Sequence, residues 1–290
     1  MQCGAQTYRI MDCVLIASGS KGNCIYVGNG SDSIVVDAGV GYLKRTLEEH
    51  GLPIGIIRAL CITHEHSDHC QSAKAFLKAL QIPVAGSGGT LSVLRETDQF
   101  PTGTDCIMFH AGDPHMIGGL EVTSFRTYHD AAEPTGFIID DGDSRIGICL
   151  DTHQVSDSMF NQLKKCDAVI LESNYAEKTM RTDRFDPCEH CQHCGAECNG
   201  YCGVRFPYPR YLKDRIIQDG HLSNEATSAV LSRMKDSVGI FALAHLSENY
   251  NRPSIARKKA EEALRESHAE LYVSDQFPMY REKRMVKFTI

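Results

Sequence analysis

The chain lacks the features that would place it in a membrane or divide it into loosely linked domains. None of its apolar runs approaches the roughly 18 residues that a helix needs to span a bilayer. The N-terminus has no charged start followed by an apolar segment, which is the pattern of a secretory signal. No stretch has the Gly/Ser-rich or Pro-rich composition of a linker. We therefore expect a cytoplasmic protein with a single large domain over residues 11–290, preceded by an extension over residues 1–10.

The chain also lacks a positive net charge. With 30 Lys and Arg against 37 Asp and Glu, its formal net charge is −7, which argues against general electrostatic binding to nucleic acid. A local basic groove is compatible with this balance. One compact basic stretch is present, formed by Arg205, Arg210, Lys213 and Arg215. We interpret it as a candidate contact to a phosphate backbone, although a solvated helix face is the commoner meaning of such a run.

Cysteine is abundant, and the 13 cysteines fall into two groups. Eight are scattered singly, mostly in apolar segments, as is typical of small buried side chains in a reducing compartment. The other five lie in a polar insertion over about residues 181–206: Cys188, Cys191, Cys194, Cys198 and Cys202. Their spacing fits a structural zinc ion, which we favour, or an iron–sulfur cluster. A short segment without a core of its own needs such a metal to hold its shape, and a disulfide-linked loop is the less favoured alternative.

The strongest chemical signal is the segment Thr63–His69, which reads THEHSDH. It follows residues 57–62, a short and mostly apolar run that predicts a buried strand. Four of its side chains are candidate metal ligands: His64, His66, Asp68 and His69. Imidazole and carboxylate together suit zinc, and also manganese or iron. A surface turn with unpartnered histidines is the weaker alternative.

Other polar residues also follow predicted strands directly. They are His129 after residues 120–127, Asp151 after residues 145–150, and His245 after residues 240–244. Such strand ends can converge on one place. Asp37 closes a further apolar strand, where a free carboxylate is costly to bury, so we expect it to orient the metal loop.

The order of the predicted elements favours an α/β fold. Two successive strand-rich halves, each followed by helices, predict two mixed sheets packed face to face with helices outside. The turn after the first strand, SGSKGN, suits a loop that cradles phosphate about as well as a plain hairpin turn. Its candidate substrate contacts are Ser18, Ser20, Lys21 and Asn23.

The order HxHxDH, His129, Asp151 and His245 resembles the metallo-β-lactamase fold superfamily of hydrolases, over nearly all of residues 11–290 except the insertion. The segments ASGSKGNCIYV, VDAG, TYHDAAEPTGF, LESNY, GHLSNEA and AHLSENYNRP are similar to the YycJ/WalJ group within it. The resemblance implies an αββα sandwich and a metal-dependent hydrolase. DNA exonuclease activity is ascribed to that group, so it also implies phosphodiester hydrolysis in nucleic acid.

The resemblance further implies a site for two divalent ions, which would be zinc, manganese or iron. One ion would be held by His64, His66 and His129, the other by Asp68, His69 and His245, with Asp151 between them. Two such ions share a water and lower its pKa toward roughly 7, which supplies a metal-bound hydroxide as nucleophile. Asp68 therefore counts among the candidate catalytic residues as well as the ligands.

The segment GHLSNEA resembles a histidine motif at the start of a late helix in tRNase Z, a related phosphodiesterase. We expect His221 to contact the scissile phosphate or to protonate the leaving oxygen, with Glu172 orienting it. The alternatives are a histidine that only packs near a helix cap and a simple strand-end carboxylate. Four further candidate substrate contacts are Asn174, Arg210, Lys213 and Asn224.

Two other functions stay open at this point. The acidic net charge favours a small-molecule metallo-hydrolase that acts on cyclic nucleotides, thioesters or lactones. A module in which the cysteine cluster carries out redox chemistry or nucleic-acid binding is the third possibility. The preferred prediction is a two-metal phosphodiesterase with DNA as its substrate.

Overall fold

The computed structural model describes residues 11–185, 203–276 and 286–290. The predicted N-terminal extension over residues 1–10 lies outside the described residues. So do all five cysteines that are predicted to hold a further metal: Cys188, Cys191, Cys194, Cys198 and Cys202.

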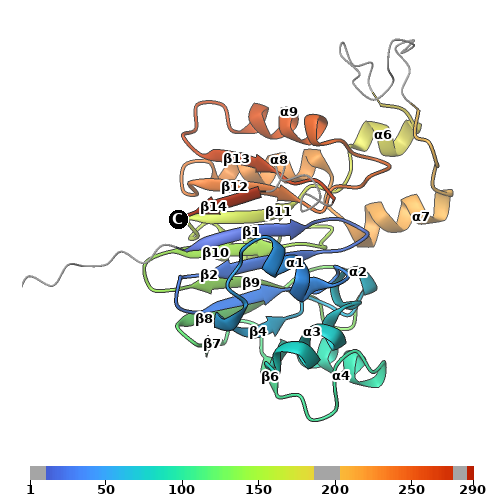
Figure 1. Ribbon diagram of the computed structural model, residues 1–290. Helices are drawn as coiled ribbons and strands as arrows, with labels where there is room; N and C mark the ends of the chain where they lie inside the picture. The colour runs from blue at the N-terminus through green and yellow to red at the C-terminus, as the bar shows by residue number, and fades with distance from the viewer. Residues whose placement is uncertain (1–10, 186–202, 277–285) are drawn as a thin grey trace, which may run out of the picture.

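Two seven-stranded sheets form the centre of the molecule (Figure 1). The first has the order β14 (Val286–Thr289), β1 (Asp12–Ala17), β2 (Cys24–Gly28), β3 (Ser33–Val36), β4 (Ile57–Cys61), β5 (Val84–Ser87) and β6 (Cys106–Phe109). The second has the order β13 (Glu270–Val273), β12 (Ile240–Ala244), β11 (Ala168–Glu172), β10 (Arg145–Cys149), β9 (Thr135–Asp140), β8 (Leu120–Arg126) and β7 (Pro114–Ile117). Each sheet contains both parallel and antiparallel pairs, so the predicted pair of mixed sheets is confirmed.

The strands are apolar because both of their faces are covered. In β1, Cys13 and Leu15 belong to the core between the sheets, whereas Val14 and Ile16 belong to the core beneath the helices. Alternate residues of a strand point to opposite faces, so burial on both sides requires a continuous apolar run. This is why the sequence shows short apolar stretches rather than a clean alternation of polar and apolar residues.

Helices cover the outer face of each sheet. The first sheet packs against α1 (Leu43–Glu49), α3 (Ala73–Leu80) and α4 (Gly88–Glu96). The second packs against α5 (Asp157–Leu163), α8 (Asn224–Met234) and α9 (Pro253–Ala263). The expected arrangement of helices outside two face-to-face sheets is therefore confirmed. Within the described ranges, no helix is both long and apolar enough to cross a membrane.

The local structure departs from the predicted elements at three places. A separate short helix, α2 (Ser67–Cys70), begins inside the THEHSDH segment and ends one residue after it, ahead of α3. Helix α6 (Glu177–Thr182) runs into the start of the predicted insertion, and Arg184 and Gly203 pair across the base of that insertion. Helix α7 (Arg210–Arg215) continues as a π-helical turn over Ile216–Gly220, which the sequence analysis does not predict.

Candidate metal centre

The THEHSDH loop is held against the first sheet by backbone hydrogen bonds. The amide of Asn23 donates to the carbonyl of Asp68 at 2.7 Å, and the amide of Ala38 donates to the carbonyl of His69 at 2.7 Å. Gly39 packs so tightly against this loop that a Cβ atom there would lie 1.7 Å from the Asp68 carbonyl oxygen. The turns after β1 and β3 therefore fix the position of the candidate ligands.

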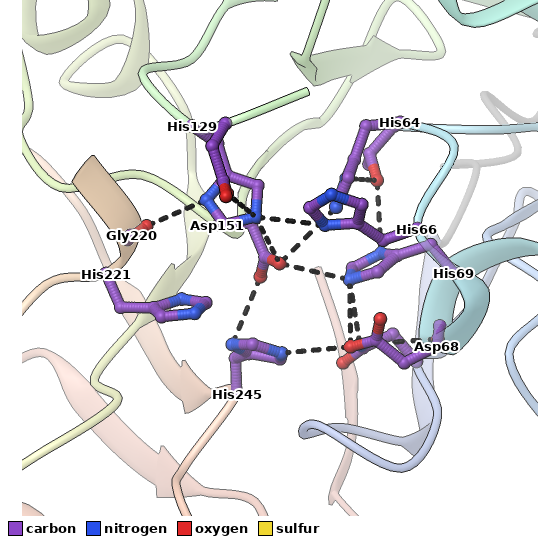
Figure 2. A network of polar contacts seen from close by, with 12 residues as sticks. His64, His66, Asp68, His69, His129, Asp151, Gly220, His221 and His245 are labelled. Atoms are coloured by element: carbon purple, nitrogen blue, oxygen red, sulfur yellow. Dashed lines mark hydrogen bonds and ion pairs between the residues drawn. The ribbon is translucent and has the colours of Figure 1, made fainter. Parts of the chain in front are cut away.

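His64, His66 and His129 form the first group of candidate ligands (Figure 2). The Nδ1 atom of His129 donates to the carbonyl of Gly220 at 2.9 Å, which leaves Nε2 with its lone pair. This Nε2 lies 3.2 Å from Nδ1 of His66. The His64 ring lies 4.6 Å from the His66 ring and 5.0 Å from the His129 ring. Three imidazoles thus converge on one point, as tetrahedral zinc sites require.

Asp68, His69 and His245 form the second group together with Asp151. The Nδ1 atom of His69 lies 2.7 Å from Oδ2 of Asp37, so the proton stays on Nδ1 and Nε2 points inward. This Nε2 is 3.5 Å from Oδ2 of Asp68, and Nε2 of His245 is 3.6 Å from the same oxygen. Asp37 therefore lies where the sequence-based prediction needs it, behind a ligand.

Asp151 lies between the two groups (Figure 2). Its Oδ2 atom is 3.5 Å from Nε2 of His64 and 3.5 Å from Nε2 of His129 on one side. The same oxygen is 3.2 Å from Nε2 of His69, and Oδ1 is 3.1 Å from Nδ1 of His245. One carboxylate thus contacts histidines from both groups.

Three residues of the site have backbones in the left-handed region. The φ angles are 65° at Asp37, 46° at Asp151 and 54° at His245, and each residue lies within two residues of the end of a strand. Such conformations are uncommon for residues other than glycine and gather at functional sites. The sequence predicted that these residues lie near strand ends. It did not predict their left-handed backbone conformation, which directs each side chain toward the candidate metal centre.

The polar atoms of the cluster fit divalent metal ions. Among the described residues, three buried atoms that face this centre have no hydrogen-bond partner: Nε2 of His64, Oδ1 of Asp151 and Nε2 of His245. An unpaired buried polar atom is costly, so a cluster of them needs an explanation. Imidazole nitrogens and carboxylate oxygens are ordinary ligands of zinc, manganese and iron. Coordination of cations by the two groups would satisfy these atoms.

Glu172 and His221 lie beside the second group. The fully buried Glu172 accepts hydrogen bonds through Oε1 from Nδ1 of His221 at 2.6 Å and from Nδ1 of His245 at 2.8 Å. Its other oxygen accepts from the amides of Thr152 and Leu222. The His221 ring lies 5.1 Å from the rings of both His129 and His245. Glu172 therefore holds both histidines by Nδ1, which leaves each Nε2 for other partners.

The electrostatics of the cluster keep its groups in opposite charge states. Burial is the largest influence on His64 and His129 and lowers the pKa of both imidazoles. Burial also opposes the charged form of His245, but Asp151, Asp68 and Glu172 outweigh it and raise the pKa of His245 to about 10. Against the same burial penalty, His245 and His69 hold the pKa of Asp151 well below its usual range. His245 therefore carries its second proton at neutral pH when no metal ion is bound to it.

We expect metal binding to this site to become stronger as the pH rises. The folded-state pKa of His245 lies above the unfolded value of roughly 6.5, so its proton stabilises the metal-free fold fully below about pH 6.5. That stabilisation is lost as the pH rises toward about 10, while competition between proton and metal also disappears. The measurement is the Tm of chelator-treated protein with and without added zinc, between about pH 6.5 and 9. The increase in Tm on zinc addition should grow with pH, and an increase that stays constant would contradict the prediction.

Four of the predicted substrate contacts are buried behind the site. The Ser18 hydroxyl accepts from the His245 amide at 2.6 Å, and Nδ2 of Asn174 donates to the His245 carbonyl at 2.8 Å. Asn23 and Asn224 are also buried, the former against the metal loop and the latter in a network with Ser173. The structure therefore argues against direct substrate contact by Ser18, Asn23, Asn174 and Asn224, because their polar groups are already used to hold the site.

The other candidate substrate contacts differ in exposure and in whether an acidic side chain already pairs with them. Lys213 is largely buried and pairs with Asp183 at 2.6 Å, and Arg215 pairs with Asp130. Lys21 pairs with Glu248 at 2.5 Å. The Arg210 side chain is 95% exposed and lies 3.8 Å from Asp214, and Ser20 is exposed as well. Arg210 is thus better placed than Lys213 to meet a phosphate backbone.

The sequence analysis missed several groups that position the site. The Gly220 carbonyl fixes the tautomer of His129, and it reaches that ring because the π-helical turn ends there. Gly39 was seen only as part of the VDAG segment, although the whole ligand loop packs against it. A backbone carbonyl has no sequence signature, so only the structure could identify the first of these.

A pair of face-to-face mixed sheets with a histidine and aspartate cluster at the strand ends defines a metal-dependent hydrolase of the metallo-β-lactamase fold. Residues 32–245 match the family described as "Beta-lactamase superfamily domain", and the chain belongs to this family.

Named relatives agree with this assignment. The chain is 30% identical over 257 residues to exodeoxyribonuclease YycJ of Bacillus anthracis, covering 87% of this chain and 88% of the relative. It is 26% identical over 273 residues to exodeoxyribonuclease WalJ of Streptococcus pneumoniae, covering 92% of each. The expected resemblance to the YycJ/WalJ group is therefore confirmed.

Solved structures support the fold alone. The metallo-β-lactamase fold protein YhfI of Bacillus subtilis superimposes with a TM-score of 0.69 at 17% identity, covering 97% of this chain and all of that chain. The short form of human tRNase Z superimposes with a TM-score of 0.60 at 14% identity, covering 96% of this chain and 98% of that chain. They confirm the predicted αββα sandwich, while the family match and the named relatives confirm the metal-dependent hydrolase.

Proposed function

We propose that the protein is a phosphodiesterase with two metal ions that cleaves nucleic acid, with DNA as its substrate and removal of terminal nucleotides as its mode of action. The observation that carries this proposal is the position of Asp151 between two groups of candidate ligands, within 3.5 Å of histidines from both. A carboxylate shared in this way is the arrangement expected between two adjacent metal ions. The exodeoxyribonuclease names of the relatives support the choice of substrate.

Each group of residues has a distinct part in the proposed reaction. Bound divalent ions would acidify a water molecule and offset the charge that develops on the phosphate. Asp37 and Glu172 keep the protons of His69 and His245 on Nδ1, so that each Nε2 faces the centre. His221 lies at the edge of the cluster, where its Nε2 can donate a proton to the departing oxygen.

Burial disfavours the charged form of His221, but Glu172 and then Asp151 outweigh it and raise the pKa of this imidazole. The raised pKa favours the protonated form of His221, which is the form that a general acid needs. Its Nδ1 is committed to Glu172, so Nε2 is the nitrogen left for the substrate.

Cleavage of labelled single- and double-stranded DNA in the presence of manganese or zinc tests the proposed function. Bis-p-nitrophenyl phosphate and a thioester run beside it. We expect release of mononucleotides from DNA together with hydrolysis of bis-p-nitrophenyl phosphate. Turnover of the thioester alone would instead establish the small-molecule hydrolase that the acidic net charge favours.

Replacing His221 with alanine should lower the turnover of DNA about 100-fold, at the lower end of what general acid catalysis contributes. Metal content should not change, because Nδ1 of His221 is hydrogen-bonded to Glu172, although His221 lies close enough to Asp151 and His245 for metal content to need checking. The measurement is kcat together with metal analysis of the same preparation. Exposed His110 replaced by alanine is the control and should retain full activity. Loss of metal from His221→Ala would make this residue a ligand and exclude the role as acid.

Other proposals rest on the sequence alone. The cysteines of the insertion suit a structural zinc ion, with an iron–sulfur cluster as the alternative. A single domain over residues 11–290 and a cytoplasmic location likewise stay predictions.

A further inference from the structure

A cavity of about 300 Å³ lies next to the candidate metal centre and is not part of it. It is half open and is lined by the loop that follows β12, by the base of the insertion and by the segment after β13. The lining groups used below are Phe185, Arg205, Ser247, Asn249, Arg252 and Asp275. A volume at the lower end of the usual range for ligand pockets, roughly 300–1,000 Å³, has room for one small polar molecule.

The cavity shares its wall with a candidate metal ligand. Leu246 and Ser247 line it and directly follow His245 in the chain, so Ser247 Cα lies within about 7.6 Å of His245 Cα. The Ser247 amide donates to the carbonyl of Asn174 at 2.8 Å, and Asn174 in turn donates to the His245 carbonyl at 2.8 Å. A group bound in the cavity would therefore adjoin a phosphate held at the metal centre.

Two arginines give the cavity its capacity to bind an anion. The guanidinium of Arg252 packs over the ring of Phe185 at 3.9 Å, and that of Arg205 lies over the ring of Phe206 at 5.2 Å. The close contact with the Phe185 ring restrains the guanidinium of Arg252 and leaves the N–H groups at its edge available, whereas Arg205 lies over an exposed ring at a longer distance. Arginine in such a position recognises phosphate through two parallel hydrogen bonds.

Polar groups other than the arginines also line the cavity. Asn249 and Ser247 carry amide and hydroxyl groups, and two carboxylates lie beside them: Glu248, which pairs with Lys21, and Asp275. A ligand that suits both the arginines and these groups has an anionic end and a part with hydrogen-bond donors and acceptors. A nucleotide has both, because its phosphate is anionic and its base edge carries donors and acceptors.

We propose that this cavity is a nucleotide subsite, in which Arg205 and Arg252 bind the phosphate of one nucleotide and the polar groups beside Asn249 face its base or sugar. The inference rests on the proposed function and deepens it, since it assigns the place of a nucleotide next to the phosphate under attack. The nucleotide belongs to the substrate strand during the reaction, and the same chemistry retains a released mononucleotide.

The test compares Arg205→Gln, Arg252→Gln and the double variant with Arg257→Gln. Arg257 lies on α9 near Arg252 but pairs with Glu261, outside the cavity lining, so its replacement is the matched control. Binding of dAMP and of a short single-stranded oligonucleotide is measured with a chelator present, so that no cleavage occurs. We expect the double variant to bind both about tenfold more weakly and Arg257→Gln to bind them normally. Arg252→Gln removes the contact with Phe185 and could lower the Tm. In that case Arg205→Gln, which keeps this contact, is the variant that tests the cavity.

With metal present, the KM for the oligonucleotide should rise about tenfold in the double variant, while kcat at saturating substrate changes less than about twofold. Unchanged dAMP and oligonucleotide binding in a double variant with a normal Tm would overturn the subsite. Weaker oligonucleotide binding with unchanged dAMP binding would also overturn it, because the arginines would then contact only distant backbone. If the protein fails to cleave DNA, the proposed function fails, whereas the dAMP measurement still decides whether the cavity binds a nucleotide.

Discussion

Replacing Asp151 with asparagine should lower hydrolysis of DNA and of bis-p-nitrophenyl phosphate by about 10³-fold or more, as for other members of a catalytic unit. The substitution keeps the shape of the side chain but removes the charge that faces four histidines at 3.1–3.5 Å. Asparagine also tolerates the left-handed backbone, with φ at 46°, so the turn itself is preserved. The loss therefore reports on the carboxylate rather than on the fold.

The measurement is kcat/KM together with the number of metal ions per chain. We expect fewer bound ions, because a neutral amide bridges two cations poorly. Asp98 provides the matched control, since it is also an aspartate with a positive φ angle, 56°, but lies on the surface beside Lys74. Asp98→Asn should retain metal and activity. Full metal content and near-normal activity in Asp151→Asn would rule out a shared ligand at this position.

Replacing Gly39 with alanine should displace the THEHSDH loop without changing the side chain of any candidate ligand. The new Cβ atom would lie 1.7 Å from the carbonyl oxygen of Asp68 and 2.6 Å from the amide nitrogen of Asn23, both of which are backbone atoms. Neither can turn aside as a side chain does, so the loop itself must move. A displacement of about 1 Å in a catalytic group can cost about 10²-fold in rate, and two ligands move here.

For Gly39→Ala we expect a loss of activity greater than about 10²-fold and a fall of roughly 1–3 kcal/mol in the free energy of unfolding. Activity, metal content and denaturant unfolding are the measurements. Gly41→Ala, two residues further along the same loop, is the control, because a Cβ there meets nothing within 4 Å. A Gly39→Ala protein with normal metal content would show that the loop does not depend on this contact.

The two buried carboxylates behind the ligands have parallel roles. Asp37 holds Nδ1 of His69 from the first sheet, and Glu172 holds Nδ1 of His245 and of His221 from the second. Backbone amides also donate hydrogen bonds to each carboxylate. Asp37 accepts from the amide of Thr63, and Glu172 accepts from the amides of Thr152 and Leu222. The orientation of the candidate ligands is thus built into the ends of both sheets, which ties the metal centre to the core.

The sequence predicted the elements whose cause is local. The apolar runs gave the strands because burial on both faces demands continuous apolar residues. The start of α8 is likewise local, because the Ser223 hydroxyl accepts from the amide of Ala226, as serine commonly does ahead of a helix. Helix α2 and the π-helical turn at Ile216–Gly220 were not predicted. Both are short, and tertiary contacts around the site decide them, so no period of apolar residues marks their presence.

By itself the sequence determined the THEHSDH motif, the strand ends that carry polar residues and, through resemblance, the family and the fold. Those features depend on residue type and spacing, and both can be read directly from the sequence. Only the tertiary structure decided that Ser18, Asn23, Asn174 and Asn224 support the site from behind, and that Glu172 serves two histidines at once. The reason is physical: whether a polar side chain faces a substrate or a neighbouring backbone depends on burial and on contacts between distant segments, and neither is written in local sequence.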